Sequence, residues 1–492
     1  MNLLIFLCEI IPSSDGNLPV RAAYNFYGNS FLTNEESCSK QTNATWKKVR
    51  KRSIHFTNHF WPITNHSSVE HKTEKSNFNF NLQQLQIQNM SNLCTLSSSF
   101  IFNNIQPFKF CNSTKNHHRC RNLKLKMCSS SSSVPQKATV VGCGSVTVDF
   151  LATVSAYPKP DDKIRTTNLK VQGGGNAGNA LTCLARLGLN TRLISKIADD
   201  SPGKGILDEL RTDGVDTSFI VVSKEGTSPF TYIIVDNEMK TRTCIHTPGY
   251  PPMIPQDLSE SSLLSALDGA SIVYFDGRLY ETALVVAHEA ARKNIPILID
   301  AERPREGLDD LLELADYVVC SAKFPKAWTE ASTVPRALVS ILLRLPNVKF
   351  VAVTLGKDGC ILLERSVNAS PATEEVDVDN LVESLELRKD KSASIPTCIS
   401  SSVAKLKAEG VGTVIGKLYV GTAESIPPSE LVDTTGAGDA FIGSVIYAIC
   451  SKFSPETMLP FAANVAGAKC RDLGARSGLP YRADPRLASF IQ

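Results

Sequence analysis

The chain has 492 residues, of which 42% are hydrophobic, so it is long enough to bury one large core and to carry additional segments. Its net charge of +3 is unevenly distributed: residues 1–135 hold 15 Lys or Arg against 6 Asp or Glu, whereas the remainder holds 37 against 43. The basic surplus therefore belongs to the N-terminal part and gives no reason to expect nucleic-acid binding. With no apolar stretch near 18 residues and no zinc-type spacing among 14 cysteines, neither a membrane span nor a zinc site is expected.

The first 135 residues have the composition of a disordered leader that contains a transit peptide. No acidic residue occurs between Glu74 and Asp149, and the stretch that follows Met90 is rich in serine and basic residues. This composition is typical of an organelle transit peptide, so we predict the plastid stroma as the destination, with the cytoplasm as the alternative, and a true start near Met90. A secretory signal over residues 3–11 is the weaker hypothesis, because Glu9 interrupts it and no basic residue precedes it.

From residue 138 onward, short apolar runs alternate with helical patterns, which predicts an α/β fold with a mostly parallel sheet between layers of helices. The predicted strands are 138–143, 191–197, 271–275, 295–299, 317–320, 350–355 and 360–363. The predicted helices are 176–187, 203–213, 281–293, 334–345, 436–450 and 455–471. Residues 230–235 and 241–246 instead favour an antiparallel hairpin.

Residues 366–411 interrupt this pattern. They are rich in Ser, Glu, Asp and Lys, and they separate two strands that should be neighbours in a hairpin. A structureless loop of that length is uncommon inside a domain, so the composition predicts a flexible surface insertion.

The segment 432–443, VDTTGAGDAFIG, carries the clearest chemical signal. Gly436, Ala437 and Gly438 form a turn of small residues before Asp439, and an apolar run at helical spacing follows. Backbone N–H groups at such a helix start can approach an anion closely. A carboxylate at the same place suits a base that takes a proton from a hydroxyl while a phosphoryl group arrives.

One other interpretation of this segment remains open from the residues alone, and two are excluded. It could be an ordinary helix start with Asp433 or Thr434 as N-cap. It is not a Rossmann fingerprint, because the third glycine would fall on Phe441, and residues 410–418 have the wrong spacing for a Walker A loop.

DTTGAGDAF at 433–441, together with GGGNAGNA at 173–180, resembles the two signatures of the PfkB (ribokinase-like) carbohydrate kinases, and among them the ketohexokinases. FDGRL, ERPRE and VAGAKC agree in the same order, so the resemblance extends over about 138–479. It implies a kinase domain over 138–485 with a ribokinase-like three-layer αβα sandwich. It also implies a small β-strand lid from about 163–171 and 228–248, and ATP-dependent phosphorylation with Mg²⁺.

The resemblance also implies roles for individual residues. Asp439 would be the base, with the turn of Gly436, Ala437 and Gly438 holding the transferring group. The sugar would be bound by Asp149, Gly175, Asn176 and Asn179, with Asp149 at the carboxyl end of the first parallel strand. ATP would be bound by Arg278, Thr354, Gly356, Gly359 and Asn464. Without the resemblance, Asn176 could simply cap a helix, Asp149 could be a turn residue, and Arg278 could form a surface salt bridge.

One departure concerns magnesium. Many members of the family carry an N-x-x-E motif where this chain reads Ser321, Ala322, Lys323 and Phe324. Ketohexokinases depart at the same place, and Glu302 is the candidate to replace the missing acid, through water. A potassium site that uses Asp433 and Thr435 is a further expectation from the resemblance.

The sequence thus predicts a sugar kinase that acts on a primary hydroxyl of a furanose, with a fructose-like ketohexose as the preferred substrate. The alternatives are ribose, a nucleoside or a modified hexose, and a non-catalytic fructokinase-like assembly protein of plastids. ATP and a small sugar are the predicted partners, and Asp161, in YPKPDDKIR, matches a residue that implies a homodimer through the lid.

Overall fold

The computed structural model describes residues 137–367, 374–390 and 393–491, which all lie within the compact unit Asn122–Gln492. The predicted leader, its transit peptide and the start near Met90 lie outside the described residues. Within the described ranges, no helix combines the length and the apolar character that crossing a membrane requires.

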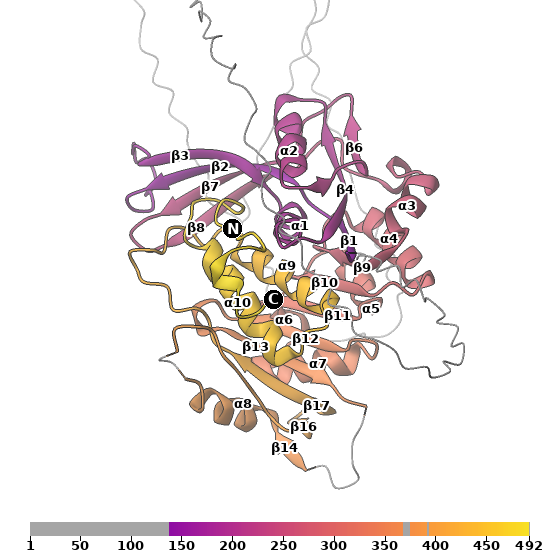
Figure 1. The fold of residues 1–492 in the computed structure, drawn as a ribbon, viewed down its shortest axis with the longest axis vertical. Coiled ribbons are helices and arrows are strands. Elements are labelled where there is room, and N and C mark those ends of the chain that lie inside the picture. Colours follow the sequence, from indigo (N-terminus) through magenta and orange to yellow (C-terminus); the bar gives the residue numbers. More distant parts are fainter. Residues whose placement is uncertain (1–136, 368–373, 391–392, 492) are drawn as a thin grey trace, which may run out of the picture. The chain divides into compact units, whose positions relative to one another are not determined.

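A large sheet forms the centre of this unit (Figure 1). Its strands follow the order β14-β16-β17-β13-β12-β11-β10-β9-β1-β4-β5, with β15 beside β17 and β6 beside β4. The parallel strands are β1 (Thr139–Cys143), β4 (Asn190–Ala198), β9 (Ala270–Phe275), β10 (Ile297–Ala301), β11 (Tyr317–Ser321) and β12 (Phe350–Thr354), joined by β5 (Val215–Asp216) and β6 (Ile220–Ser223). Antiparallel pairing adds β13 (Cys360–Arg365), β17 (Gly412–Gly421), β16 (Ala404–Ala408) and β15 (Cys398–Ser400). Since the central strands are buried on both faces, they are continuously apolar.

Helices cover both faces of this sheet (Figure 1). One apolar cluster packs α1 (Asn176–Arg186), α2 (Ser201–Thr212), α9 (Ala437–Cys450) and α10 (Pro455–Lys469) on one face. The other packs α3 (Glu260–Leu267), α4 (Tyr280–Arg292), α5 (Leu308–Glu313), α6 (Phe324–Thr329), α7 (Val334–Arg344) and α8 (Val378–Leu387). The predicted three-layer αβα sandwich is confirmed.

A second, four-stranded sheet projects from the core at one end (Figure 1). Its order is β3-β2-β7-β8, built from β3 (Asn168–Gly174), β2 (Thr147–Val154), β7 (Phe230–Asp236) and β8 (Thr241–Thr247). The hairpin expected at 230–246 is β7–β8, with Phe230 paired to Thr247. We call this sheet the lid.

The prediction of a structureless insertion at 366–411 is wrong for the described residues of that segment. They form β14 (Glu375–Asp377), α8, β15 and β16, and β16 extends the core sheet by pairing with β17. Val378 and Leu385 of α8 and Leu406 of β16 are fully buried. The composition misled because these few apolar residues recur at helix and strand periods, while the many polar residues face solvent.

The expected position of Asp149 is also corrected. The first parallel strand ends at Cys143, and Asp149 lies inside β2 of the lid rather than at the carboxyl end of a core strand. The chain leaves the core at Gly144, where a side chain would collide with the Asp276 carboxylate. Asp149 therefore reaches the site from the lid.

Candidate active site

The parallel strands end along one edge of the core sheet, and polar residues follow directly after them. Asp276 and Arg278 follow β9, Glu302 follows β10, and Thr354 ends β12. Ligands of α/β proteins bind outside this carboxyl edge.

The turn before α9 brings a cluster of backbone N–H groups to this edge. Gly436 is the N-cap of α9 with φ of 76°, and a side chain there would meet the Ala475 backbone at 2.8 Å. The N–H of Ala437 already donates to Thr434 O at 3.2 Å. Gly438 and Asp439 belong to the first helical turn, whose N–H groups lack partners within the helix. The N–H groups of Gly438 and Asp439 are therefore the ones left to bind an anion.

Asp439 is held by the amide of Asn179 from α1. Asn179 Nδ2 donates to Asp439 Oδ2 at 2.8 Å, and the Asn179 side chain is buried. Desolvation by the surrounding protein raises the pKa of Asp439 to about 6, although the Asn179 hydrogen bond and Arg278 oppose the shift. A carboxylate with a pKa near the working pH is suited to act as a general base.

The other predicted sugar ligands lie where the lid meets the start of α1. Asp149 is 5% exposed and accepts from Thr147 Oγ1 at 2.7 Å, and burial raises its pKa. Gly175, with φ of 86°, is the N-cap of α1, so the alternative role of Asn176 as the cap is wrong. Asn176 Nδ2 instead donates to Asp300 at 3.4 Å.

Arg278 belongs to a partly buried cluster of charges, in which its side chain is 23% exposed, and does not form an isolated surface salt bridge. Its Nη2 lies 3.2 Å from Glu302 Oε2, and its Nη1 lies 3.8 Å from the fully buried Asp276. Arg305 Nη2 bonds the same Glu302 oxygen at 2.6 Å. Burial opposes ionisation of Glu302, but Arg278 and Arg305 outweigh it and lower its pKa. The Glu302 carboxylate therefore stays ionised.

Sequence reasoning missed two carboxylates of this edge. Asp276 accepts from Ser145 N at 2.7 Å and from Ala177 N at 3.3 Å, so it ties α1 to the end of β9. Asp300, in β10, is 6% exposed, and burial, together with Asp439 and Glu302, raises its pKa well above the usual value. Asp300 in LIDAE and Asp276 in FDGRL each stand at the end of an apolar strand, and that position was the available signal.

Asp433 and Thr435, the expected potassium ligands, are buried and bonded to protein groups. Asp433 Oδ1 accepts from Thr435 Oγ1 at 2.7 Å, and Oδ2 accepts from Gly474 N at 2.9 Å. The fully buried Lys469 donates from Nζ to Asp433 O at 2.7 Å. These bonds fix the loop before the turn.

The residues expected to hold adenosine come from two parts of the fold. Thr354, Gly356 and Gly359 lie in and after β12 at the carboxyl edge, and a side chain on Gly359 would collide with Gly421 O. Asn464, in α10, is buried and donates to Arg486 O at 2.8 Å, so its amide also holds the C-terminal turn.

A lid arginine that the sequence did not single out also reaches the turn. Arg242 of β8 donates from Nη1 to Thr434 Oγ1 at 2.9 Å and thereby joins the lid to the loop before α9. A buried carboxylate, a helix N-terminus with free N–H groups and the nearby arginines Arg242, Arg278 and Arg305 are the groups that an ATP-dependent phosphotransferase acting on a carbohydrate hydroxyl requires.

Comparison with known proteins agrees with this class. The model of the pfkB family of carbohydrate kinases matches residues 137–380 and 389–482, so the chain belongs to that family. Mouse ketohexokinase is 25% identical over 68% of this chain and 97% of its own length, and mouse ribokinase is 23% identical over 72% and 96%. The structure of Arabidopsis thaliana ribokinase complexed with ribose and ATP covers 72% of this chain and 99% of its own, with a TM-score of 0.51 at 20% identity.

Proposed function

We propose that the protein transfers the γ-phosphoryl group of ATP to a primary hydroxyl of a furanose sugar, with a fructose-like ketohexose as the preferred substrate. The observation that carries the proposal is the pairing of Asp439 with the first turn of α9, since the base and the anion site share one loop. Asp149, which is buried in β2, and Asn176, which is half-buried in the first turn of α1, offer groups that can bind sugar hydroxyls.

Each of these residues has a separate task in the proposed transfer. Asp439 takes the proton of the attacking hydroxyl, and the N–H groups of Gly438 and Asp439 stabilise the charge of the transferring group. Arg278 adds positive charge near Asp439, because the charge of Asp439 raises the pKa of Arg278 and the charge of Arg278 lowers the pKa of Asp439. Removing such a base lowers the rate by roughly 10²–10⁴.

Magnesium bound with ATP would supply charge neutralisation between the phosphates. Two acids at the edge suit this ion: Glu302 is an ionised carboxylate, and Asp300 is a buried acid whose pKa is raised by burial and by the charges of Asp439, Glu302 and Asp276, a repulsion that a cation would relieve. Among the described residues no group of three or more His, Cys, Asp or Glu side chains is arranged to hold a metal, so the ion would depend on the phosphates of ATP for its other ligands. Potassium at Asp433 and Thr435 stays a prediction, and comparing activity in potassium and choline chloride tests it.

The choice of sugar rests on weaker support. Identities of 25% to a ketohexokinase and 23% to a ribokinase do not separate the two substrates. The lid presents Thr231 and His246 on the face that carries Asp149, with His246 Nδ1 3.3 Å from Thr231 Oγ1. Ribose, nucleosides and modified hexoses remain alternatives that the assay must include.

The test is ADP release by residues 130–492 with Mg²⁺, potassium and a panel of ketoses, pentoses and nucleosides, with Asp439→Asn in parallel. Sugar-dependent release that the variant loses supports the proposal and identifies the sugar. No turnover with any sugar, together with retention of plastid partners in a pull-down, would favour the non-catalytic assembly role instead.

We also propose a homodimer through the lid. Val171, Phe150, Tyr232 and Ile245 form one row across the four strands, on the face of the lid opposite to Asp149. Phe150 packs against the core cluster beside α2, whereas Val171, Tyr232 and Ile245 are 55%, 52% and 53% exposed. A row of this kind on an open sheet suits a second copy of the same surface. Light scattering at micromolar concentration should give twice the monomer mass, and Ile245→Asp should halve it; a wild-type monomer would contradict the proposal.

Plastid import is the remaining proposal, and it is supported only by the composition of residues 1–135. Residues 90–135 fused to a fluorescent protein should direct it to the stroma. Cytoplasmic fluorescence would favour the alternative location.

A further inference from the structure

A buried arginine outside the family's signature motifs lies behind the candidate base. Arg476 follows α10 in the segment GARSG and is 1% exposed. Its Nε donates to Asn179 Oδ1 at 3.0 Å, and its Nη2 donates to Gly174 O at 2.8 Å. Side chains on Gly173 or Gly178 would collide with the guanidinium or press against it, so two glycines of the GGGNAGN turn leave room for it.

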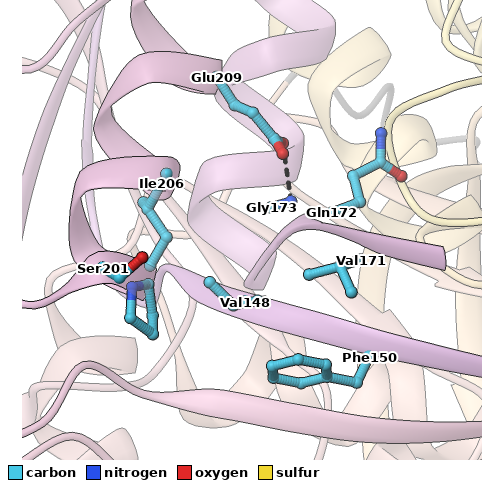
Figure 2. A pocket seen from close by; sticks show the side chains of 10 residues that line it. Val148, Phe150, Val171, Gln172, Gly173, Ser201, Ile206 and Glu209 are labelled. Atoms are coloured by element: carbon cyan, nitrogen blue, oxygen red, sulfur yellow. Dashed lines mark hydrogen bonds between the residues drawn. The ribbon is translucent and has the colours of Figure 1, made fainter. Parts of the chain in front are cut away.

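The charge of Arg476 is balanced from both sides of the turn. Glu209 of α2 accepts from Gly173 N at 2.7 Å and lies 3.8 Å from Arg476 Nη1. Figure 2 shows Glu209 reaching the Gly173 backbone inside a cavity of about 250 Å³ that Phe150 and Val171 also line. On the site side, Asp149 is close enough for its charge to be felt by the guanidinium. A buried cation with such partners can stay charged in place.

The arrangement fixes the direction of the Asn179 amide. Because a guanidinium only donates, the atom of Asn179 that faces it must be the carbonyl oxygen. The NH₂ group is then forced toward Asp439, where it donates at 2.8 Å. A flipped amide would set NH₂ against the guanidinium and oxygen against the carboxylate, and both contacts would be repulsive.

We propose that Arg476 is a positioning residue that locks Asn179 as a one-way hydrogen-bond donor to the base Asp439. A locked donor stabilises the ionised carboxylate, the form that can take a proton. An unlocked amide could turn and accept from the protonated Asp439 hydroxyl, which would favour the inactive form. The inference rests on the proposed kinase activity, in which Asp439 is the base.

Charged groups from several elements also act on the ionisation of Asp439, in addition to the hydrogen bond from Asn179. Arg278 after β9 and Arg242 of β8 favour its ionised form, while Glu302 after β10 opposes it. The charge of Asp439 contributes to the raised pKa of Asp300 in β10. Asp433 lies in the segment that leads into α9, the helix that carries Asp439. Around Arg476, Glu209 of α2 and Asp213 at the end of α2 contribute negative charge, and Arg186 of α1 donates to the Arg476 carbonyl at 2.7 Å.

The experiment is the pH profile of kcat/KM for Arg476→Met, Arg476→Lys, Asn179→Ala and the double variant Arg476→Lys/Asn179→Ala. Arg476→Met should move the acid limb upward by about one pH unit, the scale of a lost hydrogen bond to a charged group. Arg476→Lys keeps a positive charge at the buried position, which should help the variant fold. It lacks the planar guanidinium that reaches Gly174 O and Asn179 Oδ1 together, so we expect the acid limb to move upward by less than in Arg476→Met. In the Asn179→Ala background, Arg476→Lys should add no shift.

Arg186→Met is the matched control. It removes two hydrogen bonds to the same loop, at Arg476 O and Leu479 O, but it leaves Asn179 untouched. It should lower the thermal midpoint and leave the acid limb in place. An unmoved limb in every folded Arg476 variant, or a Lys shift that persists without Asn179, would overturn the proposal.

The proposed function can fail without affecting the test of the lock. If the wild-type protein phosphorylates no sugar, the proposed function is wrong. The ionisation of Asp439 can then be measured by NMR from the ¹³C chemical shift of its carboxyl carbon, and the signal is assigned by its absence in Asp439→Asn. An Asp439 titration that moves upward in Arg476→Met, or in Arg476→Lys if Met does not fold, supports the lock. A titration that stays in place overturns it.

Discussion

Asp439→Asn should remove activity and at the same time stabilise the folded protein. The folded state holds the Asp439 pKa at about 6 against an ordinary value of 3.8, mainly because the site desolvates the carboxylate. An acid whose pKa is raised on folding binds its proton more tightly in the folded state, so stability falls as pH rises from 3.8 to about 6 and is constant above. At pH 8 the ionised carboxylate therefore costs about 3 kcal/mol, which the neutral asparagine avoids.

Two assays test this reasoning. Below pH 6, log kcat/KM of the wild-type protein should fall with unit slope. Asp439→Asn should lose roughly 10²–10⁴ in rate above pH 6 and should lack this acid limb, so its deficit should shrink as the pH falls below 6. In urea unfolding, the advantage of Asp439→Asn over the wild type should grow by about 1.4 kcal/mol between pH 5 and pH 8. Asp208→Asn, on the exposed face of α2, is the matched control and should change neither quantity. Equal stability of the variant and the wild type at both pH values would refute the reasoning.

Three further predictions concern the turn, the metal and the buried lysine. Gly436→Ala should lower the free energy of unfolding by about 1–3 kcal/mol, because its φ of 76° strains any side chain and Ala475 leaves no room, whereas Gly205→Ala meets no neighbour and should cost nothing. Glu302→Gln should raise the Mg²⁺ concentration for half-maximal activity roughly tenfold, and an unchanged magnesium titration would contradict its role. Lys469→Met should cost about 1–3 kcal/mol in urea unfolding and lower kcat, since the carbonyl that its ammonium bonds would be buried without a donor; wild-type values for both would show that the loop needs no such support.

Several parts of this protein could be predicted because they depend on local pattern. The alternation of apolar runs and helical periods gave the layers and the parallel sheet, since strands buried on both faces must be apolar throughout. The tight turn at Gly436 and the place of Asp439 in the first turn of α9 could be predicted from spacing, because a helix start is made by consecutive residues. The hairpin β7–β8 followed from two short runs of period two.

What only the tertiary structure decided depends on residues that are distant in the chain. Asp149 was placed on the wrong sheet, because the sequence does not show that the chain leaves the core at Gly144. The composition of 366–411 predicts a loop, because its few apolar residues are buried only once β16 pairs with β17, a strand that follows this segment in the chain. The bond from Asn179 to Asp439 spans 260 positions and that from Arg476 to Asn179 spans 297, so neither leaves a trace in local spacing. The sequence by itself determined the fold class and the turn that precedes α9, because both depend on local pattern. The packing of α1, α9 and the loop after α10 determined which atoms each candidate group faces, because those contacts join residues that are far apart in the chain.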